Sequence, residues 1–271
     1  MYKLIAIDAD GTLVNDDKKI TQKTIENIKK AIKNNTKIVI SSARSFYRLK
    51  DYLEELGLLE DNQYTISFNG AVIVENKSQE ILSSINFQEK EVLELIELAK
   101  FFETPISLYA MNYLITEEIP EILKNNKHQK NVNFRVSKFE KIDFNKDRIY
   151  KIVFVNNPEN ITKIKQKLPQ ELYQKYEITS SVPEYIEFVK KGITKSKALD
   201  FICQKCNIHK SEVIAIGDAD NDLEMINFAG LGVAMGNATN SLKEKADYIT
   251  SSNNDDGVAK VIEKYILKGV H

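Results

Sequence analysis

Short, wholly apolar runs alternate with amphipathic segments near both ends of the chain. The runs at 4–7, 38–40 and 213–216 contain only apolar side chains, which is typical of strands buried on both faces of a sheet. Between the runs, apolar residues recur every three or four positions, as in the segment 25–32, and this spacing predicts helices. The alternation predicts an α/β fold, in which helices cover both faces of a parallel sheet.

The same rules predict the other elements of this part of the chain. Thr21 has the character of an N-cap for the helix that follows it, and Asn69-Gly70 is typical of a turn between two extended segments. We expect further helices at 46–56, 194–206 and 256–267, and further strands at 64–68, 71–74, 232–234 and 248–250.

The middle of the chain has a different pattern. Helices are predicted at 89–101 and 160–168, among short extended segments at 106–108, 112–116, 132–136, 150–155, 176–180 and 186–189. No acidic cluster follows any of these segments. This is an α+β pattern, and we expect residues 83–190 to form a domain inserted into a core made of residues 1–82 and 191–271.

Polar side chains of a particular kind follow three of the apolar runs. Asp8 and Asp10 follow the first run, and Ser42 and the cluster 217–222 follow two others, while Lys195 lies in the first turn of a predicted helix. Residues i and i+2 at a strand end point the same way, so the two carboxylates can converge. They repel each other unless a cation joins them or one of them is protonated, and Mg²⁺ accepts such carboxylates together with phosphate oxygens. A strand running into an acidic turn is the simpler alternative for a single Asp-x-Asp-Gly.

In this order and spacing the chain resembles the haloacid dehalogenase superfamily of phosphohydrolases, in its Cof-type branch with a large α/β cap. The resemblance implies a Rossmann-like core with the cap inserted between the second and third motifs. One departure is Ser42-Ala43-Arg44, where this branch usually has Thr-Gly-Arg, so Ala43 must not need a positive φ. The segments that carry the resemblance are 8–13, 42–44, 67–71, 195–199, 217–225, 233–238, 246–250 and 256–259.

The resemblance implies a role for each matching residue. Asp8 is expected to be the nucleophile and Asp10 the general acid and base. The expected Mg²⁺ ligands are Asp8, the main-chain carbonyl of Asp10, Asp218 and Asp222, although Asp222 could instead act through water or by orienting Lys195. The expected phosphate-binding residues are Ala9, Ser42, Ala43, Lys195 and Asn221.

Simpler roles remain open for several of these residues. Ser42 could be a helix cap, and Thr12 could have no role beyond hydrogen bonding within its turn. The pair Asn69-Gly70 could be a turn rather than part of the rim of the site. The pair Cys203 and Cys206 lies in a helical pattern without a second Cys pair, which favours a structural role over zinc or redox chemistry.

Composition narrows the class of protein further. The formal net charge is −1, from 38 basic and 39 acidic side chains, so the chain lacks the excess of positive charge that is typical of nucleic-acid-binding proteins. No apolar run approaches membrane-spanning length, and the first strand begins too early to leave room for a signal peptide. We therefore expect a cytoplasmic protein without a nucleic-acid or membrane partner.

The expected activity is Mg²⁺-dependent hydrolysis of small phosphorylated metabolites, such as sugar phosphates or phosphorylated cofactors, through an aspartyl-phosphate. A sugar-phosphate phosphomutase and a non-catalytic sensor of phosphorylated ligands are the alternatives. The sequence leaves the substrate and the oligomeric state open. The side chains of the middle region that could contact the substrate include Tyr109, Asn112, Tyr113, Lys127 and Arg135.

Overall fold

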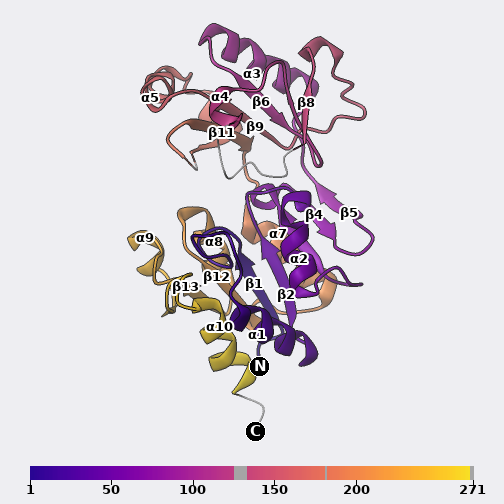
Figure 1. Cartoon of the computed structure of the whole chain (residues 1–271), viewed down its shortest axis with the longest axis vertical. Coiled ribbons are helices and arrows are strands. Elements are labelled where there is room, and N and C mark those ends of the chain that lie inside the picture. The colour runs from indigo at the N-terminus through magenta and orange to yellow at the C-terminus, as the bar shows by residue number, and fades with distance from the viewer. Residues whose placement is uncertain (125–132, 181, 269–271) are drawn as a thin grey trace. The chain divides into compact units, whose positions relative to one another are not determined.

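The computed structural model (Figure 1) describes residues 1–124, 133–180 and 182–268. The chain divides into two compact units. The first, here called the core unit, comprises Met1–Ser84 and Thr194–His271, and the second, here called the inserted unit, comprises Ile85–Ile193. None of the described helices has both the length and the apolar character needed to cross a membrane.

The core unit is built on an eight-stranded sheet in the order β14-β13-β12-β1-β2-β3-β4-β5. The strands from β14 to β3 are parallel, while β4 and β5 are antiparallel to their neighbours. In the middle of the sheet, Ile7 pairs with Ile40 on one side and Ile216 on the other. The strands are β1 (Leu4–Asp8), β2 (Lys37–Ser41), β3 (Tyr64–Ser67), β4 (Val72–Glu75), β5 (Ile81–Ser84), β12 (Val213–Gly217), β13 (Leu231–Ala234) and β14 (Tyr248–Ile249).

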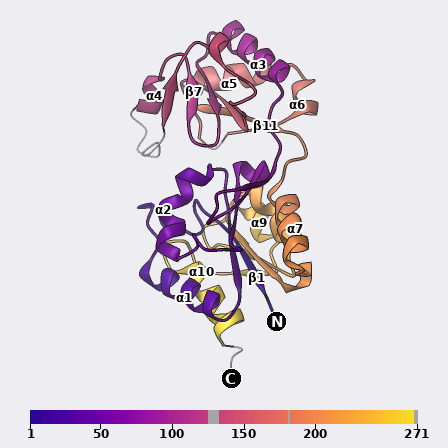
Figure 2. The same cartoon turned by 90° about the vertical axis from the view of Figure 1, so that its right-hand side faces the viewer.

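Helices cover both faces of this sheet, as the alternation predicted. Figure 2 shows α1 and α2 on one side of β1 and α7 on the other. Thr21 is the N-cap of α1, and its side chain accepts a hydrogen bond from the Thr24 N–H. The helices are α1 (Gln22–Lys33), α2 (Phe46–Leu56), α7 (Lys195–Cys206), α8 (Leu223–Phe228), α9 (Asn240–Lys243) and α10 (Gly257–Ile262), which continues as a π-helical turn (Glu263–Leu267), with short 3₁₀ turns at Phe68–Gly70, Lys210–Glu212 and Asp220–Asp222.

The inserted unit has its own six-stranded sheet, in the order β10-β11-β9-β6-β7-β8. Its strand pairs are antiparallel except β7 with β8. The longer helices α3 and α5 pack on one face, where their apolar side chains join Phe154 and Phe188 in one core. The elements are α3 (Glu89–Phe101), β6 (Ile106–Tyr109), β7 (Leu114–Thr116), α4 (Glu121–Lys124), β8 (Phe134–Val136), a 3₁₀ turn (Phe139–Lys141), β9 (Lys151–Val155), α5 (Pro158–Lys167), α6 (Leu172–Lys175), β10 (Tyr176–Thr179) and β11 (Tyr185–Lys190).

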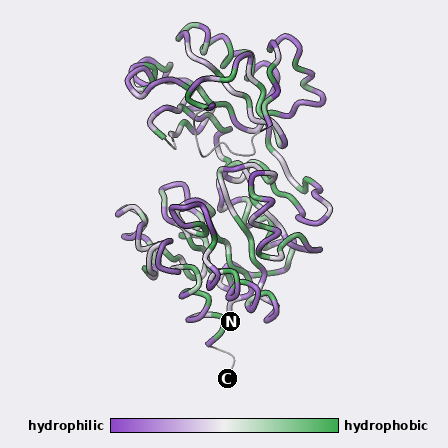
Figure 3. Tube along the Cα trace, in the orientation of Figure 1, coloured by the Kyte–Doolittle hydropathy of each residue, from purple (hydrophilic) through white to green (hydrophobic). Residues whose placement is uncertain are grey.

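The structure contains elements that the sequence did not predict, namely the edge strand β5 and the short helices α4, α6, α8 and α9. Strand β5 (Ile81–Ser84) was not predicted, because only Ile81 and Leu82 are apolar and the strand pairs with β4 alone. The strand predicted at 132–136 begins at Phe134, and its first residue lies outside the described part of the chain. In both units the hydrophobic segments follow the inner strands, as the green parts of the trace in Figure 3 show.

Candidate active site

Three neighbouring strands of the core sheet end in polar residues at the same edge. Asp8 is the last residue of β1, Ser41 is the last of β2, and Asp218 follows Gly217 at the end of β12. Because β1 lies between β2 and β12 and all three are parallel, their carboxyl ends meet. This is the edge at which open α/β sheets bind their ligands.

Three carboxylates gather here around one ammonium group. Oxygen atoms of Asp8, Asp218 and Asp222 lie within 4.8 Å of one another. Lys195 Nζ donates to Asp8 Oδ1 and, at 2.6 Å, to Asp222 Oδ1. Lys195 is the first residue of α7, as predicted, and it is 1% exposed. Three carboxylates and one ammonium leave this cluster with an excess of negative charge.

The pKa values in the cluster show this excess. Burial raises the pKa of Asp8 well above its usual value, and Lys195 lowers it again only in part, while Asp222 and Asp218 add to the increase. Burial and the charge of Asp222 raise the pKa of Asp218 to about 6, against the hydrogen bond from Thr12. A divalent cation would relieve the repulsion, and carboxylate oxygens are the ligands that Mg²⁺ prefers. The cluster therefore fits the metal site that the sequence predicts.

Both oxygens of Asp222 are bound within the cluster. Its Oδ1 accepts from Lys195, and its Oδ2 accepts from the backbone N–H groups of Asp218 and Ala219 at 3.0 and 3.2 Å. A Cβ at Gly217 would lie 2.5 Å from the Asp222 Cβ, so this loop needs glycine there. The geometry matches the alternative in which Asp222 orients Lys195.

The loop after β1 is fitted to the loop after β12. Thr12 Oγ1 donates a hydrogen bond to Asp218 Oδ1 at 2.8 Å, so Thr12 does more than stabilise its own turn. Gly11 has a φ of +79°, and a Cβ there would overlap the Asp218 carboxylate. Asp218 is thus contacted at two points by the loop that follows Asp8.

The side chain of Asp10 lies outside the acidic cluster, in contact with two cations. Arg44 Nε donates to Asp10 Oδ2 at 2.7 Å, and Arg44 Nη2 donates to Oδ1, which also accepts from Lys18 Nζ at 3.0 Å. Burial raises the pKa of Asp10, but Arg44 and Lys18 outweigh burial and lower the pKa to about 2. Nothing in the sequence pattern predicts the Lys18 contact, because Lys18 lies in the polar run 16–19.

The expected phosphate-binding residues come from loops that contact each other. The Asn69 N–H donates to the Ser42 carbonyl at 2.9 Å, and Asn221 Nδ2 donates to Asn69 Oδ1 at 3.2 Å. Ala43 is not among the residues with positive φ in the described part of the chain, so the departure from Gly is tolerated there. Ala9, which directly follows Asp8 in the sequence, is fully buried.

Ser42 is not the cap of α2, because the N-cap of that helix is Ser45. The Ser42 hydroxyl instead accepts a hydrogen bond from the Arg44 N–H at 3.1 Å. Because the hydroxyl oxygen acts as an acceptor in this bond, its own proton can still be donated to a phosphoryl oxygen. Asn69-Gly70 forms the turn between β3 and β4, as predicted, and that turn also contacts Ser42.

The two cysteines have the environment of structural residues. Both are free thiols on α7, and Cys203 is buried. Burial raises the pKa of Cys203 to about 12 and also raises that of Cys206, so neither is a thiolate at neutral pH.

The side chains of the inserted unit that could contact a substrate are partly engaged with one another. Tyr113 Oη donates to Asp147 Oδ1 at 2.5 Å, and Arg135 makes a two-pronged contact with the same carboxylate. Lys151 lies over the Tyr109 ring, 4.8 Å from its centroid. The Asn112 carbonyl accepts from Asn133, and Lys127 lies outside the described residues.

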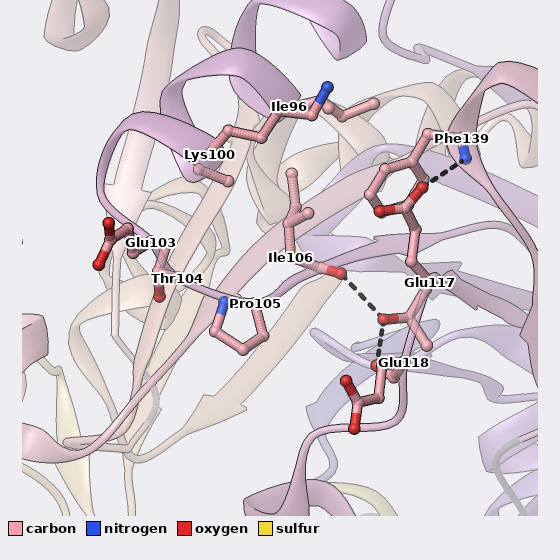
Figure 4. A pocket seen from close by; sticks show the side chains of 11 residues that line it. Ile96, Lys100, Glu103, Thr104, Pro105, Ile106, Glu117, Glu118 and Phe139 are labelled. Carbon is pink, nitrogen blue, oxygen red and sulfur yellow. Dashed lines mark hydrogen bonds between the residues drawn. The ribbon is translucent and has the colours of Figure 1, made fainter.

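A cavity of about 320 Å³ in the inserted unit is unsuited to phosphate (Figure 4). Glu103, Glu117 and Glu118 line it, and its one lysine, Lys100, is paired with Glu97 at 2.8 Å. None of the residues predicted to carry the chemistry lines this cavity. Its acidic lining would repel a phosphate group.

Known proteins are similar to this chain in sequence and in fold. The pattern of the haloacid dehalogenase-like hydrolase family matches residues 5–262, so the chain belongs to that family, as predicted. The 5-amino-6-(5-phospho-D-ribitylamino)uracil phosphatase YcsE of Bacillus subtilis is 33% identical over 281 residues, covering 98% of this chain and 96% of that protein.

Two solved structures extend the comparison. A haloacid dehalogenase-like hydrolase from Bacteroides thetaiotaomicron has a TM-score of 0.89 and 32% identity, over 97% of this chain and 99% of that one. The subclass IIB sugar phosphatase BT4131 has a TM-score of 0.79 at 24% identity, over 97% of this chain and 98% of that one, which shows a common fold. The predicted class, phosphoric monoester hydrolase, agrees with the names of these relatives.

Proposed function

We propose that this protein is a Mg²⁺-dependent phosphatase that hydrolyses small phosphorylated metabolites through an aspartyl-phosphate. The observation that carries the proposal is the position of Asp8, a buried carboxylate between one ammonium group and two further carboxylates. A carboxylate in such a place can attack phosphorus only if the surrounding charge is balanced by a cation.

The proposed reaction has two displacements. An oxygen of Asp8 attacks the phosphorus, the bond from phosphorus to the ester oxygen breaks, and Asp10 gives a proton to the leaving alcohol. Asp10 then takes a proton from water as the water oxygen attacks the phosphorus of the aspartyl-phosphate. The products are the alcohol, inorganic phosphate and the original Asp8 carboxylate.

The other residues bind the phosphoryl group and balance its charge. Lys195 neutralises charge on the phosphoryl oxygens, and the hydroxyl of Ser42 and the amide of Asn221 donate hydrogen bonds to them. The backbone N–H groups of Ala9 and Ala43 would add donors of the same kind. Asp8, the Asp10 carbonyl, Asp218 and the support of Asp222 would hold Mg²⁺, which when bound withdraws charge from the transferred phosphoryl group.

We further propose a division of roles between the two parts of the chain. The residues 1–82 and 191–271 would carry out the reaction, since all the residues named above lie there, and residues 83–190 would select the substrate. The relatives are named for a ribitylamino-uracil phosphate and for sugar phosphates. These names favour a phosphate ester of a hydroxyl-rich alcohol as the substrate of this chain.

A phosphate-release assay tests the activity and separates it from the two alternatives. We expect the protein to release phosphate from p-nitrophenyl phosphate with Mg²⁺ and to lose that activity in excess chelator. The Asp8→Asn variant should remain folded and lose at least about a thousandfold in kcat, because its amide cannot act as the nucleophile.

Other results would support the alternatives. Transfer of the phosphoryl group only to an added sugar phosphate would indicate a phosphomutase. Binding of phosphate esters with neither release nor transfer would indicate a sensor. Turnover by Asp8→Asn close to that of the parent would exclude the proposed nucleophile.

A further inference from the structure

The cavity of about 320 Å³ in the inserted unit has an apolar floor (Figure 4). Its volume lies within the range of small-molecule sites, which is about 300–1,000 Å³. The floor comes from the last turns of α3, the start of β6 and the 3₁₀ turn after β8, and all its residues except Pro105 are buried. A hydrocarbon chain that covered this floor would remove apolar surface from water. The floor consists of Ile96, Ala99, Pro105, Ile106 and Phe139.

Carboxylates lie on two sides of this floor. In Figure 4 the side chain of Pro105 lies between Glu103 on one side and Glu118 on the other. Glu103 follows α3 and Glu118 follows β7, so the two come from different segments. Glu117 adds a third carboxylate, which accepts a hydrogen bond from the Phe139 N–H at 3.1 Å. The three negative charges are therefore distributed around the floor and are not gathered at one point.

The lysines that interact with these carboxylates have partners of their own. The charge of Glu117 acts on Lys100 and that of Glu118 acts on Lys124. Each of these lysines is paired with a glutamate of its own helix, at 2.8 Å in α3 and 2.5 Å in α4. Within the described part of the chain, the side chains of Glu103 and Glu118 form no ion pair and accept no hydrogen bond. Both carboxylates are thus available to a cation from outside the chain.

The electrostatic field at the cavity favours positive charge. The pKa of Lys100 is raised, mainly by its hydrogen bond and ion pair with Glu97, and the charges of Glu140 and Glu117 raise this pKa further. A second ammonium group in the cavity would face the same carboxylates. Charge complementarity therefore selects a cationic ligand, and the floor selects one with a hydrocarbon part.

We propose that this cavity binds an aliphatic diamine, with its hydrocarbon chain on the floor and one ammonium group at each of Glu103 and Glu118. A ligand with a single ammonium group would leave one of the two carboxylates unpaired, and a neutral diol would leave both unpaired. This site goes beyond the proposed phosphatase activity, because none of the residues that carry that activity lines the cavity.

The test measures binding of 1,6-diaminohexane to the full chain, with 1-hexylamine and 1,6-hexanediol as matched ligands. The NMR shift of the Phe139 amide reports on the cavity, because this N–H donates to Glu117. A ligand with eight non-hydrogen atoms should bind with a Kd on the order of 1 mM. Since an exposed ion pair contributes at most about fivefold in affinity, hexylamine should bind about two- to fivefold more weakly than the diamine. The diol should bind more weakly than hexylamine.

A double variant and a matched control locate the binding. Glu103→Gln, Glu118→Gln keeps the size of both side chains and removes both charges, so the Kd of the diamine should rise about fivefold or more while that of the diol stays unchanged. Both positions are exposed, so the variant should fold as the parent does. Glu177 is exposed on the edge strand β10, and Glu177→Gln should bind the diamine as the parent does.

Several results would overturn the inference. The first is an equal Kd of the diamine for the parent and the double variant, and the second is an equal affinity of the parent for the diamine and either matched ligand. The third is the absence of binding at about ten times the expected Kd. A lysine-rich peptide that binds more tightly than the diamine, and that loses affinity in the double variant, would assign the cavity to a basic protein segment. None of these measurements depends on phosphatase activity, so failure of the proposed function would leave them unchanged.

Discussion

Replacing Lys195 by Met should destabilise the protein strongly in the absence of a divalent cation. The ammonium is buried and contacts Asp8 and Asp222, both of which are also buried. Removing one partner of a buried ion pair typically costs about 3–5 kcal/mol, because a buried charge is left without compensation. At about 2–4 °C per kcal/mol for a domain of this size, the melting temperature should fall by about 6–20 °C.

Mg²⁺ should reverse part of this loss, since it would supply positive charge to the same carboxylates. A cation present at about 100 times its dissociation constant adds about 2.7 kcal/mol to the stability of the folded state. Mg²⁺ should therefore stabilise the Lys195→Met variant more than an equal concentration of Na⁺ does. The second variant Lys195→Met, Asp222→Asn should be more stable than Lys195→Met alone, because it has one buried charge fewer.

Thermal and urea unfolding followed by circular dichroism measure these differences. Lys205 is exposed and lies on the same helix α7, so Lys205→Met should change the stability by no more than about 0.5 kcal/mol. A melting temperature of Lys195→Met within about 2 °C of the parent value without Mg²⁺ would refute the argument. So would a double variant that is no more stable than the single one.

Two further changes test the fit between the loops. Asp218→Asn keeps an acceptor for Thr12 but removes a charge from the cluster. The Mg²⁺ concentration for half-maximal activity should therefore rise at least about tenfold. An unchanged Mg²⁺ concentration for half-maximal activity would exclude Asp218 as a ligand. Gly11→Ala should abolish activity because its Cβ overlaps Asp218, whereas Gly57→Ala, at a φ of +71° with nothing within 4 Å of its Cβ, should lose only about 1–2 kcal/mol of stability. Equal activity in the two alanine variants would contradict this.

The sequence predicts the core strands and the acidic cluster for the same reason. The wholly apolar runs at 4–7 and 213–216 can only be buried on both faces, and parallel strands bring their carboxyl ends to one edge. Asp8 and Asp218, which follow these runs, must therefore be close. Local pattern and sheet geometry place both residues at one edge of the sheet, and the family resemblance is what joins them in one metal site.

The contacts of Asp10 could not be predicted in this way. Arg44 and Lys18 are 34 and 8 residues away from it in sequence, and nothing in their neighbours shows which carboxylate a flexible cation will reach. The same holds for β5, an edge strand whose place depends on pairing with β4 rather than on its own apolar pattern. Contacts of this kind are decided by tertiary structure.

The loop that follows the proposed nucleophile also depends on residues near the end of the chain. Asn237 Nδ2 donates to the Gly11 carbonyl at 2.8 Å, and its Oδ1 accepts from the Asn253 N–H at 2.9 Å. Asn253 Nδ2 in turn donates to the Val14 carbonyl at 3.1 Å. Both ends of the loop after β1 are thus fixed by two asparagines that take no part in the proposed chemistry. The position of Asp8 is therefore a property of the whole core unit, because residues on both sides of the insertion must be present to hold it.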